Sequence, residues 1–100
     1  MQKRVDEFVA RHGMQCGAYA RFTDLVSEVG ELGKELLKGT GYGKQEYEAA
    51  PGAEEEAGDC LFALMALCSE MGIDAEKALD GALTKYSRRF AGKGSADSGR

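Results

Sequence analysis

Apolar side chains recur every three or four residues through a long segment in the first half of the chain. Between about residues 19 and 38 they occupy Phe22, Leu25, Val29, Leu32 and Leu36. Helix positions three and four apart share a face, so these side chains form one apolar stripe. The segment therefore predicts a long amphipathic helix with one buried face. Gly39 follows it, and glycine is favoured where a helix stops.

Three further segments carry the helical spacing, and no segment alternates apolar and polar residues as a half-buried strand does. We therefore predict an all-α fold of four helices, the other three spanning residues 2–12, about 51–71 and about 74–90. Asp74 is a suitable N-cap for the last of these. The helix over 51–71 is apolar on most sides between Leu61 and Cys68, so we expect it to be the most buried. One domain over 1–91 and a disordered tail over 92–100, which is small and polar, complete the prediction.

The composition excludes several classes of protein. The longest apolar run, Cys60 to Cys68, is far shorter than the roughly 20 residues that cross a bilayer. The first residues lack the apolar segment of a secretory signal. The three cysteines have neither the number nor the spacing of a disulfide framework or a zinc site. We therefore expect a cytoplasmic protein without a membrane partner.

Charge is distributed unevenly along the chain. Residues 84–100 contain five basic side chains and one acidic one, so with a total net charge of −4 the rest of the chain carries −8. A duplex-binding surface would need a broad basic face, so we expect no nucleic-acid partner. An acidic body beside a basic helix suits an anionic ligand that is held through a metal ion.

Two short phrases with the same acid spacing lie on the second and third expected helices. Residues 28–31 read Glu-Val-Gly-Glu, and residues 56–59 read Glu-Ala-Gly-Asp. Positions i and i+3 share a helix face, so each phrase points two carboxylates in one direction. Like charges repel there, and a glycine inside a helix costs about 1 kcal/mol relative to alanine. Solvated helix flanks would explain either pair alone, but the repeated arrangement points to a divalent cation between two helices.

The candidate metal ligands are Glu28, Glu31, Glu56 and Asp59. Carboxylate oxygens suit Mg²⁺ or Mn²⁺ better than zinc. Di-iron bundles require Glu-x-x-His motifs, and neither phrase contains a histidine. Clustered carboxylates that hold Mg²⁺ usually present it to substrate phosphates.

The acid pattern, with 24 residues between its two halves, resembles the signature of the MazG-type nucleotide pyrophosphohydrolases. This all-α superfamily also includes helical dUTPases and phosphoribosyl-ATP pyrophosphohydrolases. The segments 29–32 and 58–62 are typical of the contexts of its acidic motifs. The segment from Lys85 to Phe90 resembles the basic motif on its last helix. The resemblance covers roughly residues 5–90.

The resemblance implies a four-helix MazG-like bundle with a metal site between the second and third helices. It implies that the four acids bind Mg²⁺, with Mn²⁺ as a possible substitute, and that Glu31 and Glu56 act in catalysis. Lys85, Arg88 and Arg89 would contact the phosphate tail of the substrate. The implied reaction is hydrolysis of a (d)NTP to a (d)NMP and pyrophosphate, in a role that clears non-standard nucleotides. The implied assembly is a homodimer or homotetramer with active sites near the subunit interfaces.

Two positions depart from the family pattern and keep alternatives open. Many members have a second glutamate where this chain has Ser27, and many have an asparagine where this chain has Leu83. One alternative is a specialised enzyme that acts on dUTP or phosphoribosyl-ATP. The other is a non-catalytic helical module that binds nucleotide or protein without turnover.

Two other residues are weaker candidates. We interpret His12 as a partly buried residue on a helix face, because a single histidine is more often packed than ligating. Glu35 lies one turn beyond Glu31 and would be either a further ligand or part of a solvated face with nearby lysines.

Overall fold

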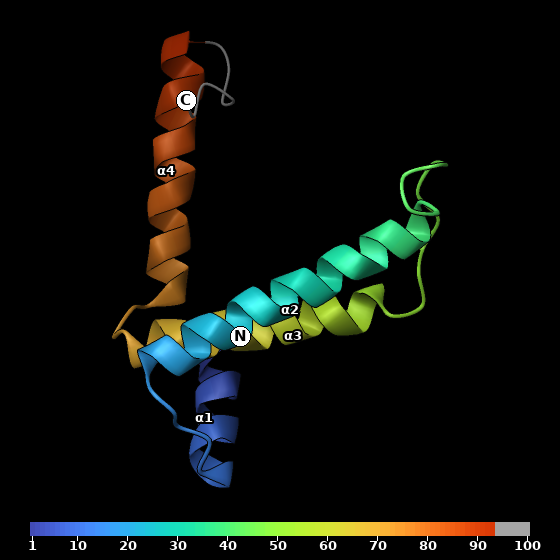
Figure 1. Ribbon diagram of the computed structural model, residues 1–100. Helices are drawn as coiled ribbons and strands as arrows, with labels where there is room; N and C mark the ends of the chain where they lie inside the picture. Colours follow the sequence, from blue (N-terminus) through green and yellow to red (C-terminus); the bar gives the residue numbers. More distant parts are fainter. Residues whose placement is uncertain (94–100) are drawn as a thin grey trace.

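A computed structural model describes residues 1–93, and that part of the chain contains four helices and no strand. The helices, shown in Figure 1, are α1 (Gln2–His12), α2 (Ala18–Gly39), α3 (Ala53–Glu70) and α4 (Ala75–Lys93). The predicted all-α fold is therefore confirmed, with helix bounds close to those expected. The first two residues of the expected tail, 92 and 93, belong to α4, and 94–100 lie outside the described residues.

Local sequence explains where the helices end. Gly13 closes α1 with φ 61°, a left-handed conformation that glycine adopts without steric cost. The Asp74 carboxylate accepts a hydrogen bond from the Lys77 backbone N–H at 3.1 Å, as expected of an N-cap. Gly39 is the last residue of α2 for another reason. A Cβ atom there would lie 2.6 Å from the Tyr47 ring and from the Glu48 carbonyl oxygen, so the loop after α2 folds directly over this position.

Helix α3 lies at the centre of the molecule. Both α2 and α1 pack against it, α2 along its length and α1 across it (Figure 1). Most of the buried apolar residues also belong to α3, namely Ala63, Met65 and Ala66, and α1 adds Val9. The expectation that this helix is the most buried is therefore confirmed. Its two buried alanines leave room for close packing of the neighbouring helices.

The apolar stripe of α2 is only partly covered. Leu25 and Leu32 are half-buried, but Phe22, Val29 and Leu36 are 54%, 54% and 52% exposed. The prediction that the whole stripe is buried is wrong for the single chain. Helix α3 contacts one side of the stripe and leaves the other side of α2 open.

Helix α4 stands away from the rest of the chain. Figure 1 shows it rising steeply from the end of α3, and within residues 1–93 it packs along none of the other helices. The radius of gyration is 16.7 Å, whereas a compact chain of this length has a value of about 13 Å. The single chain is therefore open. Among the described residues, no helix combines the length and apolar character needed to cross a membrane.

Candidate metal centre

The packing of α2 along α3 brings the two acid phrases together. Glu28 of α2 and Glu56 and Asp59 of α3 each offer a carboxylate oxygen, and these three oxygens all lie within 4.8 Å of one another. The two residues on α3 are three positions apart, so they point to the same side of that helix. Glu28 approaches them from the neighbouring helix. Three of the four candidate ligands therefore meet between the second and third helices, where the sequence predicts the site, and their role as metal ligands stays a prediction.

The geometry of this acid cluster (Glu28, Glu56 and Asp59) fits a small divalent cation. Mg²⁺ binds oxygen at about 2.0–2.1 Å, so opposite ligands around it are separated by roughly 4.2 Å. The separations of up to 4.8 Å are slightly wider, and a small rotation of the side chains would close the difference. The donors are oxygen atoms only, as Mg²⁺ and Mn²⁺ prefer.

The charges of the cluster oppose one another. The pKa of Glu28 is raised above its ordinary value, first by desolvation and then by the negative charges of Asp59, Asp24 and Glu31. The pKa of Glu56 is also raised, again first by desolvation and then by Asp59, Glu28 and other acids. The fully ionised cluster is therefore unfavourable, and a bound cation would relieve that repulsion.

Glu31, the fourth candidate ligand, lies beside the cluster and outside the group of three. Its side chain is exposed. Its negative charge nevertheless contributes to the raised pKa of both Glu28 and Glu56, so it shares their electrostatic environment. Its role as a metal ligand or catalytic group stays a prediction.

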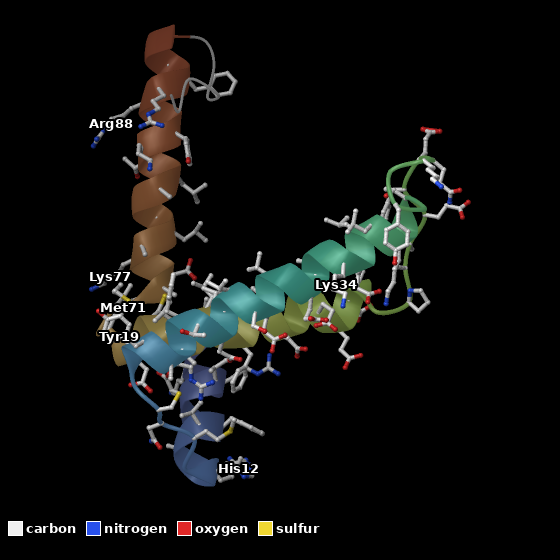
Figure 2. The ribbon with its side chains drawn as sticks, viewed as in Figure 1. His12, Tyr19, Lys34, Met71, Lys77 and Arg88 are labelled. Atoms are coloured by element: carbon white, nitrogen blue, oxygen red, sulfur yellow. The ribbon has the colours of Figure 1, made fainter. Side chains whose placement is uncertain are left out.

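The basic residues assigned to substrate binding are not beside the acid cluster of their own chain. Lys85, Arg88 and Arg89 all belong to α4, which stands away from α2 and α3, and Figure 2 shows Arg88 pointing away from the body of the molecule. Two of them flank the Tyr86 ring. The Lys85 Nζ lies 4.9 Å and the Arg89 guanidinium carbon 5.6 Å from its centre. Within one chain, these cations and the acids therefore form two separate groups.

The sequence interpretation missed a charged pair at the start of α2. Arg21 is buried, 6% exposed, and donates a hydrogen bond to the Met14 carbonyl oxygen at 2.7 Å. Its guanidinium also lies over the Phe62 ring and 3.6 Å from the Asp24 carboxylate. Arg21 thus ties the connection before α2 to α3. Asp24 precedes Glu28 by four residues, and this spacing is the sequence signal that could have identified it as a neighbour of the cluster.

Glu35 is engaged away from the acid cluster. Its carboxylate pairs with Lys38 at 3.1 Å, and this hydrogen bond is the main reason that the pKa of Lys38 is raised. A Cβ atom on Gly52, just before α3, would lie 2.8 Å from that carboxylate. Glu35 therefore contacts the N-terminal end of α3, where helix N–H groups favour a negative charge.

His12 and Cys60 lie outside the group of three carboxylates that the described residues bring together. His12 is exposed, with its ring centre 4.4 Å from that of Phe8, so the expectation of a partly buried residue is wrong. Cys60 is half-buried next to the cluster. Desolvation and the negative charges of Glu28, Asp59 and Glu56 raise the pKa of its thiol, which disfavours the thiolate form.

Comparison with models of known protein families places the chain. The model of the MazG nucleotide pyrophosphohydrolase domain matches residues 20–91, which include both acid phrases and the basic segment of α4. No curated protein and no solved structure matches the chain. The matched region covers most of the chain and carries the carboxylates that the fold brings together. The chain therefore belongs to the MazG nucleotide pyrophosphohydrolase domain family.

Proposed function

We propose that the protein is a Mg²⁺-dependent nucleotide pyrophosphohydrolase that converts a (d)NTP to a (d)NMP and pyrophosphate. The observation that carries the proposal is the convergence of Glu28, Glu56 and Asp59 across α2 and α3. Family membership supports the reaction class. We further propose that the enzyme works in the cytoplasm and clears non-standard nucleotides.

In this proposal, Glu28, Glu31, Glu56 and Asp59 hold Mg²⁺, and Mn²⁺ can substitute for it. The bound cation would neutralise phosphate charge and lower the pKa of a bound water molecule. The carboxylates themselves orient the attacking water. Glu31 is exposed beside the cluster, and we assign to it and to Glu56 the acceptance of the proton from this water.

Lys85, Arg88 and Arg89 are proposed to bind the phosphate tail of the substrate. Because they stand on α4, apart from the acids of their own chain, we assign this contact to a second copy of the chain. The guanidinium groups suit bidentate pairing with phosphate oxygens. The functional unit in this proposal is a homodimer or a homotetramer, in which the cluster of one chain meets the α4 helix of another.

A nucleotide panel with product identification tests this proposal. Purified protein is incubated with Mg²⁺ or Mn²⁺ and each common or damaged nucleoside triphosphate, and the products are separated by anion-exchange chromatography. The proposal expects a monophosphate and pyrophosphate from at least one substrate. A strong preference for dUTP or phosphoribosyl-ATP would indicate the specialised alternative. Release of inorganic phosphate instead would contradict the proposed reaction, and the absence of any product would contradict the proposal and favour a non-catalytic binding module.

A further inference from the structure

Arg21, near the start of α2, is a buried cation whose contacts satisfy it only in part. Its Nη2 donates the hydrogen bond to the Met14 carbonyl oxygen, and its guanidinium carbon lies 5.5 Å from the centre of the Phe62 ring. Its Nη1 is 3.6 Å from the carboxylate of Asp24, which is 44% exposed. Among the described residues, its buried Nε has no hydrogen-bond partner. A long ion pair and an unpaired buried donor add little to stability, so packing alone does not explain an arginine here.

The contact between Arg21 and Phe62 lies in the same helix interface as the acid cluster. On α2, Arg21, Asp24 and Glu28 are spaced by three and then four residues, so they share one face. On α3, Asp59 and Phe62 are three positions apart and also share a face. The two helices run antiparallel (Figure 1), so the Arg21 contact lies about two turns of α2 and about one turn of α3 from the acids.

Contacts on both sides of the acids hold α2 against α3. Toward the end of α2, Glu35 lies against Gly52. Toward its start, the guanidinium of Arg21 is attracted to the face of the Phe62 ring. Between these contacts, Glu28 meets the two acids of α3, and their like charges push the helices apart. The spacing of the carboxylates therefore depends on contacts that oppose this repulsion.

We propose that Arg21 is a positioning residue of the metal centre. Through Phe62 it holds α2 against α3, and it thereby keeps Glu28 within reach of the cation that Glu56 and Asp59 bind. Arg21 itself contacts neither the cation nor the substrate. The inference rests on the proposed function in one respect, namely that the acid cluster binds a divalent cation. Groups that orient metal ligands in this way typically change metal affinity by about 10–100-fold.

The direction of the effect separates positioning from the effect of charge. Removal of a positive charge near an acid cluster would, by Coulomb attraction alone, strengthen the binding of a cation. Removal of a contact that positions Glu28 would weaken it. A role in folding alone would instead lower the free energy of unfolding of the chain. Metal affinity and stability, measured on the same variant, therefore distinguish the three explanations.

Binding of Mn²⁺ to the full chain, measured by electron paramagnetic resonance without substrate, tests the inference. Arg21→Met keeps an unbranched apolar side chain and removes the guanidinium. We expect its dissociation constant for Mn²⁺ to rise at least about tenfold. Its free energy of unfolding in EDTA, measured with urea, should stay the same or increase, because water can solvate the half-exposed Asp24. Arg11→Met removes an exposed cation from α1 and should bind Mn²⁺ as wild type does.

Equal or tighter Mn²⁺ binding by Arg21→Met would overturn the inference, and so would weaker binding that accompanies a loss of stability. Glu56→Gln separates this failure from that of the proposed function. If wild type binds Mn²⁺ and Glu56→Gln does not, but Arg21→Met binds normally, only the role of Arg21 is wrong. If wild type binds no Mn²⁺, or Glu56→Gln binds it equally well, both the metal centre and the inference are wrong.

Phe62→Leu tests the route of the effect and offers a second probe if Arg21→Met does not fold. This change removes the ring beneath the guanidinium and leaves the positive charge of Arg21 in place. It should also weaken Mn²⁺ binding. In the Phe62→Leu background, Arg21→Met should weaken binding little further, because the contact is already lost. Additive effects of the two changes, or wild-type binding by Phe62→Leu, would overturn the route through Phe62.

Discussion

At the scale of single residues, the site is defined by carboxylates that repel one another. Desolvation and neighbouring acids raise the pKa of Glu28 and Glu56. Gly30 and Gly58 accompany them in the two phrases, and a Cβ atom added at either glycine would meet no neighbouring atom within 4 Å. Neither the charges nor the glycines are explained by packing within the chain. Both are consistent with a surface that is kept open for a cation and a ligand.

The raised pKa of Glu28 predicts how stability depends on pH without metal. Between its ordinary value of 4.5 and its raised value, the folded chain binds more protons than the unfolded chain, so stability falls as pH rises through this window. Glutamine does not ionise, so Glu28→Gln should abolish the fall in stability that ionisation of Glu28 causes. In EDTA we expect the variant to melt a few degrees above wild type at pH 7 and at the same temperature below pH 4. The exposed loop change Glu46→Gln is the control, and equal melting of Glu28→Gln and wild type at pH 7 would argue against the repulsion.

Metal binding should offset the loss of stability that the repulsion among these carboxylates causes. A cation at 100 times its dissociation constant stabilises a folded protein by about 2.7 kcal/mol. We therefore expect Mn²⁺ or Mg²⁺ to raise the melting temperature of wild type at pH 7, and the increase to be lost in Asp59→Asn. Differential scanning fluorimetry with a metal titration measures both. An equal shift in wild type and variant would place the cation elsewhere.

At the scale of helices, the sequence predicted most of the structure, because the signals are local. Gly13 and Asp74 end and begin helices through backbone contacts within a few residues of themselves. The spacing of the acids along each helix can be read from the sequence for the same reason. The distance in space between Glu28 on α2 and the two acids on α3 depends on how α2 packs on α3, and so does the burial of Arg21. No local pattern specifies that packing.

Two glycines in helices should respond in opposite ways to alanine. Gly39→Ala places a Cβ against Tyr47 and Glu48 and should destabilise the chain by about 1–3 kcal/mol through overpacking. Gly58→Ala meets no neighbouring atom and should instead stabilise α3 by up to about 1 kcal/mol. Urea unfolding followed by circular dichroism measures both. If Gly39→Ala leaves the stability unchanged or increases it, the close contact of the loop with Gly39 is not present in solution.

At the scale of the whole molecule, the chain is an open unit. The helical spacing of α4 identifies its apolar face, but the spacing does not reveal which surface covers that face. In the structure the face stays exposed, and the cations of α4 stay apart from the acids of α2 and α3. The family resemblance assigns these two groups to one site. The fold joins them only if a second chain contributes its α4.

Mixing two inactive variants tests whether the active site is shared between chains. Glu56→Gln lacks an acid of the cluster, and Arg89→Ala lacks a cation of α4, so each should be inactive alone. In a mixed dimer, one site combines an intact cluster with an intact α4 helix, so random pairing restores about a quarter of the sites. Pyrophosphate release after co-refolding measures the recovery. No recovery, with mixed dimers demonstrated by native mass spectrometry, would place the cations and acids of each site in one chain.

The most direct test of the account is Mg²⁺-dependent pyrophosphate release by wild type and by Glu56→Gln, with the substrate that the nucleotide panel identifies. Glu56 belongs to the acid cluster, and the glutamine variant keeps its shape while removing its charge. We predict that the rate of pyrophosphate release falls by a factor on the order of 10²–10³ in the variant, while its circular dichroism spectrum is unchanged. A folded Glu56→Gln protein that releases pyrophosphate at the wild-type rate would contradict the account.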